Sequence, residues 1–350
     1  MQHLLIVAAL AILLTVIMRW GFKHLPEEKW QILASVPHHK QDAASWTGVN
    51  FTFYGFFSAC AYTFAAAALI LLLESVRVSL FGLIVLIVCV LSVCIPASKI
   101  IARIVEKKSS TFTVSGASFT GIVLTPVVVV AINHFLGRFM GAALPVMTIM
   151  AALSTAYAFG EGTGRLACIS FGCCYGKRLS ECPSWVQRFM RHACFVFSGK
   201  TKKIAYAHGL DGQKVLPVQA VTSLIFCVAG LIGFYLFLEG HYPLAFILTV
   251  FITQTWRLIS ELFRADYRGE GRISAYQILS SVSIGLAVIY GVFFPADTPL
   301  AADIHAGFAA MWNPFVIILL QFIFVSIFVY TGKSRVTGSI LMFYVVQERI

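Results

Sequence analysis

The chain has 350 residues, of which 59% are hydrophobic and only 12% are charged, and its mean hydropathy is +0.85. A water-soluble globular domain has more charged residues and fewer apolar ones, so this composition excludes that class and indicates a polytopic membrane protein. The formal net charge at pH 7 is +11, and the position of these basic residues along the chain bears on its orientation in a membrane.

Nine apolar runs are long enough to cross a bilayer as helices. They lie at about 4–20, 51–73, 79–98, 112–134, 141–160, 217–238, 243–263, 273–294 and 313–331. The first run is the weakest member of this set and is also compatible with an uncleaved signal anchor, because Arg19 and Trp20 follow it where a peptidase site would have small residues. The predicted fold is therefore an all-α polytopic bundle of eight or nine transmembrane helices.

The segments that connect these runs differ in their content of Lys and Arg. The loops after the odd-numbered runs hold nearly all of them: Lys23, Lys29, Lys40, Lys99, Arg103, Lys107, Lys108, the stretch from Arg165 to Lys214, Arg264, Arg268, Arg272, Lys333, Arg335 and Arg349. The opposite loops hold Arg77 and Arg138. Because basic loops remain in the cytoplasm, the sequence predicts an external N-terminus and a cytoplasmic C-terminus. For many of these residues, setting the topology is a sufficient explanation.

Three polar stretches lie between the apolar runs. Segment 21–50 reads as a polar loop, and 165–216 is the one sizeable extramembrane segment. Within it, 185–192 has the pattern of a short basic amphipathic helix on the bilayer surface. Segment 296–312 is acidic to neutral and is expected outside. Three lysines in 165–216 are placed to attract anionic lipid, each by about 1 kcal/mol: Lys200, Lys202 and Lys203.

The segment that follows the fifth run reads Gly-Arg-Leu-Ala-Cys-Ile-Ser-Phe-Gly-Cys-Cys-Tyr-Gly, from Gly164 to Gly176. An arginine at the membrane boundary is costly unless an anion receives it, and glycines let a backbone and a ligand approach closely. Arg165 among these small residues therefore predicts a phosphate headgroup site. Glu161 lies four residues earlier on the same helical face, where it can orient Arg165 or, if burial raises its pKa, act as a base.

A second charged group stands at the end of the seventh run. Arg257 and Glu261 are four residues apart, and Glu261 and Arg264 are three apart, so a helix would place all three on one face. Glu261 would then orient both guanidinium groups, whose remaining donors stay available for a phosphate. The alternative is an interfacial ion-pair network that only fixes the depth of the helix.

Nine cysteines are present, and four of them lie inside apolar runs as small packing residues. The other five fall on one side of the membrane and imply no disulfide framework: Cys168, Cys173, Cys174, Cys182 and Cys194. Adjacent cysteines rarely bind one tetrahedral ion together and no Cys-x-x-Cys pair is present, so zinc is disfavoured. A thiolate near Arg165 would be reactive, but small residues in a tight turn are the simplest interpretation. We expect no metal and no organic cofactor.

These motifs together resemble the prolipoprotein diacylglyceryl transferase family, particularly its divergent members with a Gly-Cys-Cys-Tyr-Gly ending. Two sets match the family's cavity signatures: Gly164, Arg165, Gly172, Tyr175 and Gly176 for the first, and Arg257, Glu261 and Arg264 for the second. Three further stretches are similar to family motifs, in family order: Asn50 to Gly55 with Tyr54, Leu216 to Gln219, and Tyr276 to Ser280 with Gln277.

The resemblance implies a seven-helix membrane core at 48–295 with 165–216 as an interfacial head, while 1–47 and 296–350 are additions. It implies transfer of a diacylglyceryl group from phosphatidylglycerol to the lipobox cysteine of a prolipoprotein, in the bacterial plasma (inner) membrane. Twelve residues receive roles by this match: catalytic Arg165, Arg257, Glu261 and Tyr54, and substrate-binding Arg264, Gly164, Gly172, Tyr175, Gly176, Gln219, Gln277 and Cys168.

The chain departs from the family pattern at the acceptor side. Cys168 stands at the family's asparagine, and Ser115-Gly116-Ala117 replaces its His-Gly-Gly. The missing imidazole removes an obvious proton acceptor for a thiol nucleophile, so a different thiol, hydroxyl or small-molecule acceptor, on the cytoplasmic side, is compatible with the sequence. Two other classes stay open: a non-catalytic phospholipid-binding or translocating protein, and a thiol-redox membrane enzyme that uses Cys173 and Cys174. Nothing in the sequence indicates a nucleic-acid partner.

Overall fold

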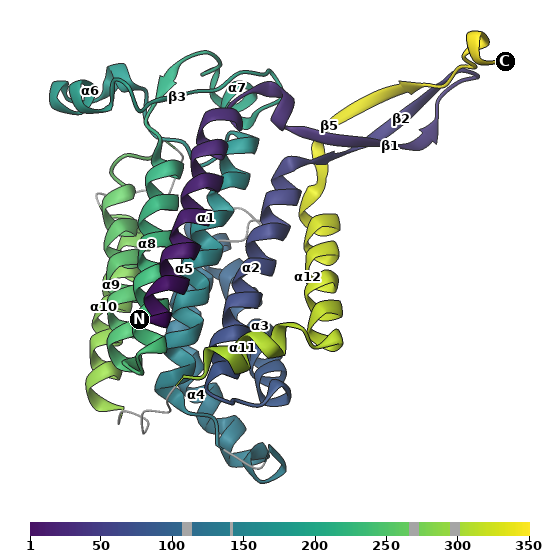
Figure 1. Ribbon diagram of the computed structural model, residues 1–350. Helices are drawn as coiled ribbons and strands as arrows, with labels where there is room; N and C mark the ends of the chain where they lie inside the picture. Colours follow the sequence, from purple (N-terminus) through teal and green to yellow (C-terminus); the bar gives the residue numbers. More distant parts are fainter. Residues whose placement is uncertain (107–113, 141–142, 266–272, 295–301) are drawn as a thin grey trace.

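The computed structural model describes residues 1–106, 114–140, 143–265, 273–294 and 302–350. Eight helices in these ranges are long and apolar enough to cross a membrane. They are α1 (Gln2–His24), α2 (Phe53–Ser75), α3 (Leu80–Glu106), α4 (Val114–Met140), α8 (Val218–Leu238), α9 (Tyr242–Ser260), α10 (Ala275–Phe293) and α12 (Pro314–Gly332). The chain is therefore a multi-pass membrane protein built mainly from helices, as predicted (Figure 1).

The fifth predicted run, 141–160, forms α5 (Val146–Phe171), a long helix that is not among these eight. It is more polar than its neighbours because it contains Glu161 and Arg165, and it lies inside the bundle against α2, α8 and α9. The sequence suggested the first run as the exception. In the structure, α1 is apolar enough to cross a membrane, and α5 is the helix that is too polar for that set. Polar side chains on α5 are compatible with its position, because it faces protein rather than lipid.

Aromatic and small side chains hold α5 against its neighbours. The Phe159 ring is fully buried and contacts Phe64 of α2 and Phe234 of α8, with ring centroids 5.3 and 6.2 Å apart. At Gly162, an added Cβ would lie only 2.6 Å from the Cys227 sulfur of α8. Small residues at such contacts let membrane helices approach closely, so α5 can carry polar groups into the centre of the bundle.

The two ends of the bundle differ in what they carry. One end of the bundle carries the head segment (Figure 1). At this end lie the C-terminal ends of α1, α5, α9 and α12 and the N-terminal starts of α2, α8 and α10. At the other end, the N-terminal turn of α1 contacts the α8–α9 turn, where His3 pairs with Glu239 at 3.1 Å. This arrangement confirms the sorting of the basic loops onto one side. Lys107, Lys108, Arg268 and Arg272 belong to the same set but lie outside the described residues.

A three-stranded antiparallel sheet was not predicted. It has the order β1 (Ile32–Lys40), β2 (Ser45–Thr52) and β5 (Lys333–Met342), and it projects away from the bundle (Figure 1). The strands come from the predicted polar loop and from the C-terminal tail, so the two terminal additions meet through pairs such as Trp46 with Leu341. Pairing partners almost 300 residues apart leave no local signal, which explains the omission.

The head segment holds α6 (Ser184–Met190), α7 (Lys203–His208) and a short two-stranded pairing of β3 (Phe195–Val196) with β4 (Lys214–Val215). Helix α6 confirms the short helix expected at 185–192, although it ends two residues earlier. Its Trp185 and Phe189 side chains are 67% and 79% exposed, whereas Val186 is buried, as an amphipathic helix requires.

One of the three lysines expected to attract lipid does something else. Lys202 is fully buried, and its ammonium donates hydrogen bonds to the carbonyl oxygens of Leu25 at 3.1 Å and Ser170 at 2.6 Å. It therefore ties the head to the ends of α1 and α5. The lipid-attracting role predicted for Lys202 is wrong, because the loop folds back onto these helix ends, whereas Lys200 and Lys203 remain exposed.

Candidate functional site

Two arginines from different helices share one carboxylate inside the bundle. Oε1 of Glu161 pairs with Arg165, one turn later on α5, and with Nη2 of Arg257 from α9 at 3.2 Å. The side chains of Glu161, Arg165 and Arg257 are only 8%, 13% and 11% exposed. The expected orientation of Arg165 by Glu161 is confirmed, and the two predicted phosphate-binding arginines converge on a single point.

The guanidinium of Arg257 is held on several sides. Besides its bond to Glu161, Nη2 donates to the Tyr157 hydroxyl at 2.6 Å, and Nη1 donates to the Ser115 hydroxyl. The guanidinium carbon also lies 5.9 Å from the centre of the Tyr157 ring and 5.7 Å from that of Phe226, within range of a cation–π interaction. Ser115, the residue that stands where the motif resemblance expects a histidine, therefore lies at the arginine site.

The charges and donors of this cluster do not balance. Two guanidinium groups and one carboxylate give a net charge of +1. The Nε atoms of Arg165 and Arg257 are both buried, and neither has a hydrogen-bond partner among the described residues. A buried donor on a charged group is costly when it is unpaired. A bound anion with several oxygen acceptors, such as a phosphate, would satisfy these donors.

Glu261 does not hold Arg257 as predicted. Helix α9 ends at Ser260, and Glu261 follows as its C-cap with a helical backbone, its N–H donating to Arg257 O at 3.3 Å. Its carboxylate accepts a long hydrogen bond from the Ser274 hydroxyl at 3.4 Å. The carboxylate partner of Arg257 is instead Glu161, from a helix distant in sequence.

The two arginine-bearing motifs meet through their backbones. Gly176 and Arg264 form an isolated antiparallel bridge, flanked by hydrogen bonds from Lys177 N to Phe263 O at 2.9 Å and from Ala265 N to the Tyr175 carbonyl at 3.2 Å. A Cβ on Gly176 would lie 2.6 Å from the Leu216 side chain, so only glycine fits this crossing. Arg264 is thereby placed beside the Gly-Cys-Cys-Tyr-Gly turn.

Three thiols gather where α5 ends. The sulfur atoms of Cys168, Cys173 and Cys174 all lie within 4.8 Å of one another, and Nη1 of Arg165 is 3.9 Å from that of Cys168. Gly172 ends the helix in the left-handed conformation (φ 69°), and Cys173 N then donates to Cys168 O at 3.0 Å. This helix ending folds the second and third cysteines back over the first.

The cysteines after the helix differ electrostatically. Hydrogen bonds from the Cys168 and Cys173 thiols, with Arg264 and Arg165 nearby, hold the pKa of Cys174 well below its ordinary value. The pKa of Cys173 is raised, because its thiol hydrogen-bonds to the two neighbouring sulfurs and is buried. Cys174 is therefore the most acidic thiol of the cluster.

Tyr54 stands beside this cluster. It lies in the first turn of α2, its ring centre is 5.4 Å from that of Phe171, and its hydroxyl interacts electrostatically with the three thiols. The arginine pair, the thiols and Tyr54 therefore form one continuous site at the basic end of the bundle.

Gln277 and Tyr175, two of the predicted substrate contacts, form hydrogen bonds within the protein instead. The Gln277 side chain completes a capping box with Ser274 at the start of α10 and also donates to Leu258 O at 3.2 Å. Tyr175 is buried, and its hydroxyl contacts His208 of α7. These contacts stabilise the local structure, so neither side chain is free to hold a substrate in this arrangement.

The other predicted contacts lie close to the thiols or within helix packing. Gln219 is 1% exposed and donates to Cys173 O at 2.8 Å, while its own Oε1 is buried without a partner among the described residues. Gly164 faces Ala61 of α2, and an added Cβ would lie at an ordinary 3.6 Å from it. The conformational freedom of glycine is therefore needed at Gly172 and its small size at Gly176, but neither is required at Gly164.

Sequence reasoning missed Tyr157. It precedes Glu161 by four residues and Arg165 by eight, so the helical repeat already placed it on the same face. A tyrosine two turns before a membrane-embedded arginine was the signal that could have identified it.

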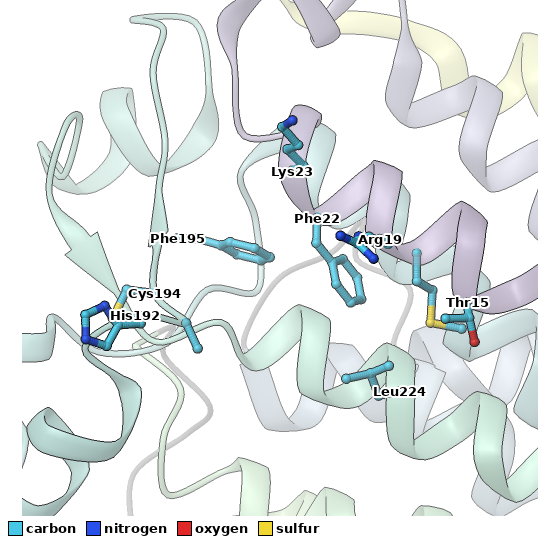
Figure 2. A pocket seen from close by; sticks show the side chains of 10 residues that line it. Thr15, Arg19, Phe22, Lys23, His192, Cys194, Phe195 and Leu224 are labelled. Carbon is cyan, nitrogen blue, oxygen red and sulfur yellow. The ribbon is translucent and has the colours of Figure 1, made fainter.

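A separate cavity of about 450 Å³ lies between α1, α8 and residues 192–195 (Figure 2). Arg19 and Lys23 line it together with apolar side chains such as Phe22 and Leu224. None of the sequence-predicted site residues belongs to it, so it is distinct from the arginine–thiol site.

Comparison with known proteins adds no relative, since no family model, no curated protein and no solved structure matches the chain. The function must therefore be argued from the geometry of the site and from the motifs.

Proposed function

We propose that this chain is a membrane transferase that moves a diacylglyceryl or related phospholipid-derived group from an anionic phospholipid to an acceptor. The main support is the buried pair of Arg165 and Arg257, which share Glu161 and retain a net positive charge. Two of their N–H donors have no partner within the residues that the structure describes. An anionic headgroup supplies the missing charge and the missing acceptors. Phosphatidylglycerol is the donor that the motif resemblance implies.

The arginines would act on the leaving group. An acceptor thiol or hydroxyl attacks the diacylglyceryl carbon, a new S–C or O–C bond forms, the bond from that carbon to the phosphate oxygen breaks, and the acceptor proton is released. The departing glycerophosphate gains a second negative charge. Donors that are already in place where charge develops lower the barrier most. We assign this role to Arg165 and Arg257, and orientation of both to Glu161.

Transfer can be measured directly. Purified protein would be incubated with labelled phosphatidylglycerol and a membrane extract, and mass spectrometry would identify the molecule that acquires the lipid. We expect Arg165→Lys and Arg257→Lys to lower transfer roughly 10- to 100-fold, the equivalent of one charged hydrogen bond. Arg178→Lys is the matched control, because Arg178 lies on the same side in an exposed pair with Glu181 at 3.6 Å.

Three outcomes contradict the proposal. Bound phosphatidylglycerol without any product would favour the non-catalytic lipid-binding alternative. Equal transfer from zwitterionic phosphatidylcholine would remove the argument from anion binding. Unchanged transfer in both arginine variants would show that these guanidinium groups do not serve the reaction.

We further propose that the site faces the cytoplasm of a bacterial cell and that the acceptor is cytoplasmic. The basic loops, the head segment and the arginine–thiol site lie at one end of the bundle, and basic loops remain inside. Reporters fused after Ile350 and in the loop at 239–242 test this, because the structure puts them at opposite ends. An exported C-terminal reporter would contradict the cytoplasmic acceptor without affecting the transferase proposal.

A specific observation also favours a second candidate, a thiol-redox enzyme. The three sulfurs lie within 4.8 Å of one another, and Cys174 has a lowered pKa because of its hydrogen bonds to Cys168 and Cys173. Such an enzyme would oxidise or reduce a dithiol partner without any lipid donor. Thiol–disulfide turnover in lipid-free detergent, together with absence of lipid transfer, would identify it.

A further inference from the structure

The spacing of the three sulfurs suits one metal ion. A Zn–S bond is about 2.3 Å, so three thiolates on one ion stand about 3.8–4.0 Å apart. The sulfurs of Cys168, Cys173 and Cys174 are already within 4.8 Å of one another, and all nine cysteines of the chain are free thiols. Small side-chain rotations would therefore suffice to close the set around an ion.

The backbone is bent in a way that makes this possible. Neighbouring side chains in an extended segment point to opposite sides, which is why adjacent cysteines seldom share an ion. Here Cys174 adopts a left-handed conformation (φ 58°), one of two non-glycine residues with positive φ in the described chain. This conformation costs roughly 1–2 kcal/mol and is typically maintained where a site requires it. The turn places both adjacent sulfurs on the same side as Cys168.

Positive charge and one more polar atom lie close to the three sulfurs. Arg165 is 3.9 Å from the Cys168 sulfur, and Arg264 interacts with Cys174, so positive charge is close to the cluster. Gln219 donates to Cys173 O, while its buried Oε1 has no partner in the part of the chain that the structure describes. In three-ligand zinc sites a water completes the tetrahedron. Such a water is the kind of donor that this amide oxygen lacks.

The remaining cysteines on this side provide a contrast. The thiol of Cys182 donates to Arg178 O at 3.3 Å, and that of Cys194 donates to Met190 O at 3.0 Å. Neither belongs to the three-sulfur group. They match the ligand candidates in residue type and in side of the membrane, which makes them suitable controls.

We propose that Cys168, Cys173 and Cys174 bind one thiophilic d10 cation, Zn²⁺ or Cu⁺, through three thiolates. Soft thiolate ligands select these ions over Mg²⁺ and Ca²⁺. The proposal does not depend on the transferase, because it rests on the three sulfurs alone. It replaces the expectation, based on the adjacent cysteines, that the chain binds no metal.

The full chain would be purified under reducing conditions from cells supplied with zinc or with copper, and its metal content measured by mass spectrometry. We expect near-stoichiometric metal in the unaltered chain and in Cys182→Ser and Cys194→Ser. Cys168→Ser, Cys173→Ser and Cys174→Ser should each retain at least tenfold less. The supply under which metal is retained distinguishes Zn²⁺ from Cu⁺. Metal retained when all three are serine would overturn the proposal.

A second measurement covers variants that fail to fold. Co²⁺ added to the metal-free unaltered chain should give an intense near-ultraviolet thiolate-to-cobalt absorption, and Zn²⁺ or Cu⁺ should remove it. The bound ion should also protect Cys168, Cys173 and Cys174, but not Cys182 and Cys194, from alkylation. A chain that takes up no Co²⁺, Zn²⁺ or Cu⁺ while all three thiols are reduced and alkylate freely would show that the cluster is only a packing arrangement.

Discussion

Two sets of buried cations lie near the end of α5, and they are stabilised differently. Lys202 has no carboxylate within hydrogen-bonding distance among the described residues, but backbone carbonyls of Leu25 and Ser170 accept its hydrogen bonds. Arg165 and Arg257 share the carboxylate of Glu161, yet the Nε donor of each has no partner in the described part of the chain. The first arrangement joins structural elements, whereas the second has two donors without an acceptor among the described residues.

The difference separates structural polar groups from candidate functional ones. Helix C-terminal carbonyls carry partial negative charge, so they stabilise a lysine ammonium without any ligand. Orphaned donors inside a protein are costly and are retained chiefly where they serve a ligand. Unpaired donors are therefore a better guide to the site than burial alone.

The largest effect is expected at Glu161. Glu161→Gln removes the charge that Arg165 and Arg257 share and leaves two buried guanidinium groups uncompensated, which typically costs about 3–5 kcal/mol. Thermal unfolding in detergent would measure the loss. Because the arginines would then take any available anion, added inorganic phosphate should raise the midpoint more in the variant than in the unaltered chain.

Glu181→Gln is the control for that change. It removes the carboxylate of an exposed pair with Arg178, which should cost about 1 kcal/mol or less. Equal destabilisation by the two substitutions would mean that the Glu161 cluster behaves as an ordinary surface ion pair.

The lowered pKa of Lys202 predicts that the free energy of unfolding depends on pH. Burial lowers the pKa of Lys202 from 10.5 to about 8 in the folded chain. Between these values the unfolded chain binds more protons than the folded one, so stability should rise as pH increases from about 8 to 10.5. The gain is at most about 1.4 kcal/mol per pH unit.

Other groups titrate in the same range, so the measurement is the difference between the unaltered chain and Lys202→Met. The difference in unfolding midpoint should move in favour of the lysine as the pH rises above 8 and stay constant below it. Parallel pH profiles would show that Lys202 does not lose its proton in the folded state.

The membrane helices and the ion pair of Glu161 with Arg165 were predictable from sequence, whereas the contacts between distant segments were not. Apolar runs long enough to cross a bilayer are visible directly, and Glu161–Arg165 follows from the four-residue helical repeat. The pairing of Glu161 with Arg257 joins residues 96 positions apart, so no spacing rule reveals it. Glu261 was assigned to Arg257 from their four-residue spacing, but the carboxylate that reaches Arg257 is that of Glu161 on α5. Helical spacing alone therefore does not identify the partner of a buried arginine.

A smaller effect is expected where α5 turns into the thiol segment. Gly172→Ala introduces a left-handed alanine (φ 69°) and places its Cβ 3.1 Å from Ile204 and 3.2 Å from the Lys202 side chain. We expect a loss of about 1–2 kcal/mol for the backbone, with a further loss from crowding. Unfolding midpoints would measure both.

Gly209 separates these two contributions. It has a similar conformation (φ 62°), but nothing lies within 4 Å of an added Cβ, so Gly209→Ala should show the backbone cost alone. A larger loss at Gly209 than at Gly172 would contradict the packing of Gly172 against Lys202.

The smallest effect is expected at Gln277, whose side-chain hydrogen bonds indicate a structural role. Gln277 accepts from Ser274 N at 2.9 Å and donates to Leu258 O at 3.2 Å, so Gln277→Ala should cost about 1 kcal/mol through loss of the cap. Gln277→Glu keeps the capping acceptor and should recover much of that loss. If Gln277 instead bound an anionic lipid, the glutamate would repel it, and lipid transfer would fall while stability was retained. Unchanged transfer with recovered stability would show that Gln277, like Lys202, has a structural role. Reduced transfer with retained stability would show that Gln277 contributes to the site around Arg165 and Arg257.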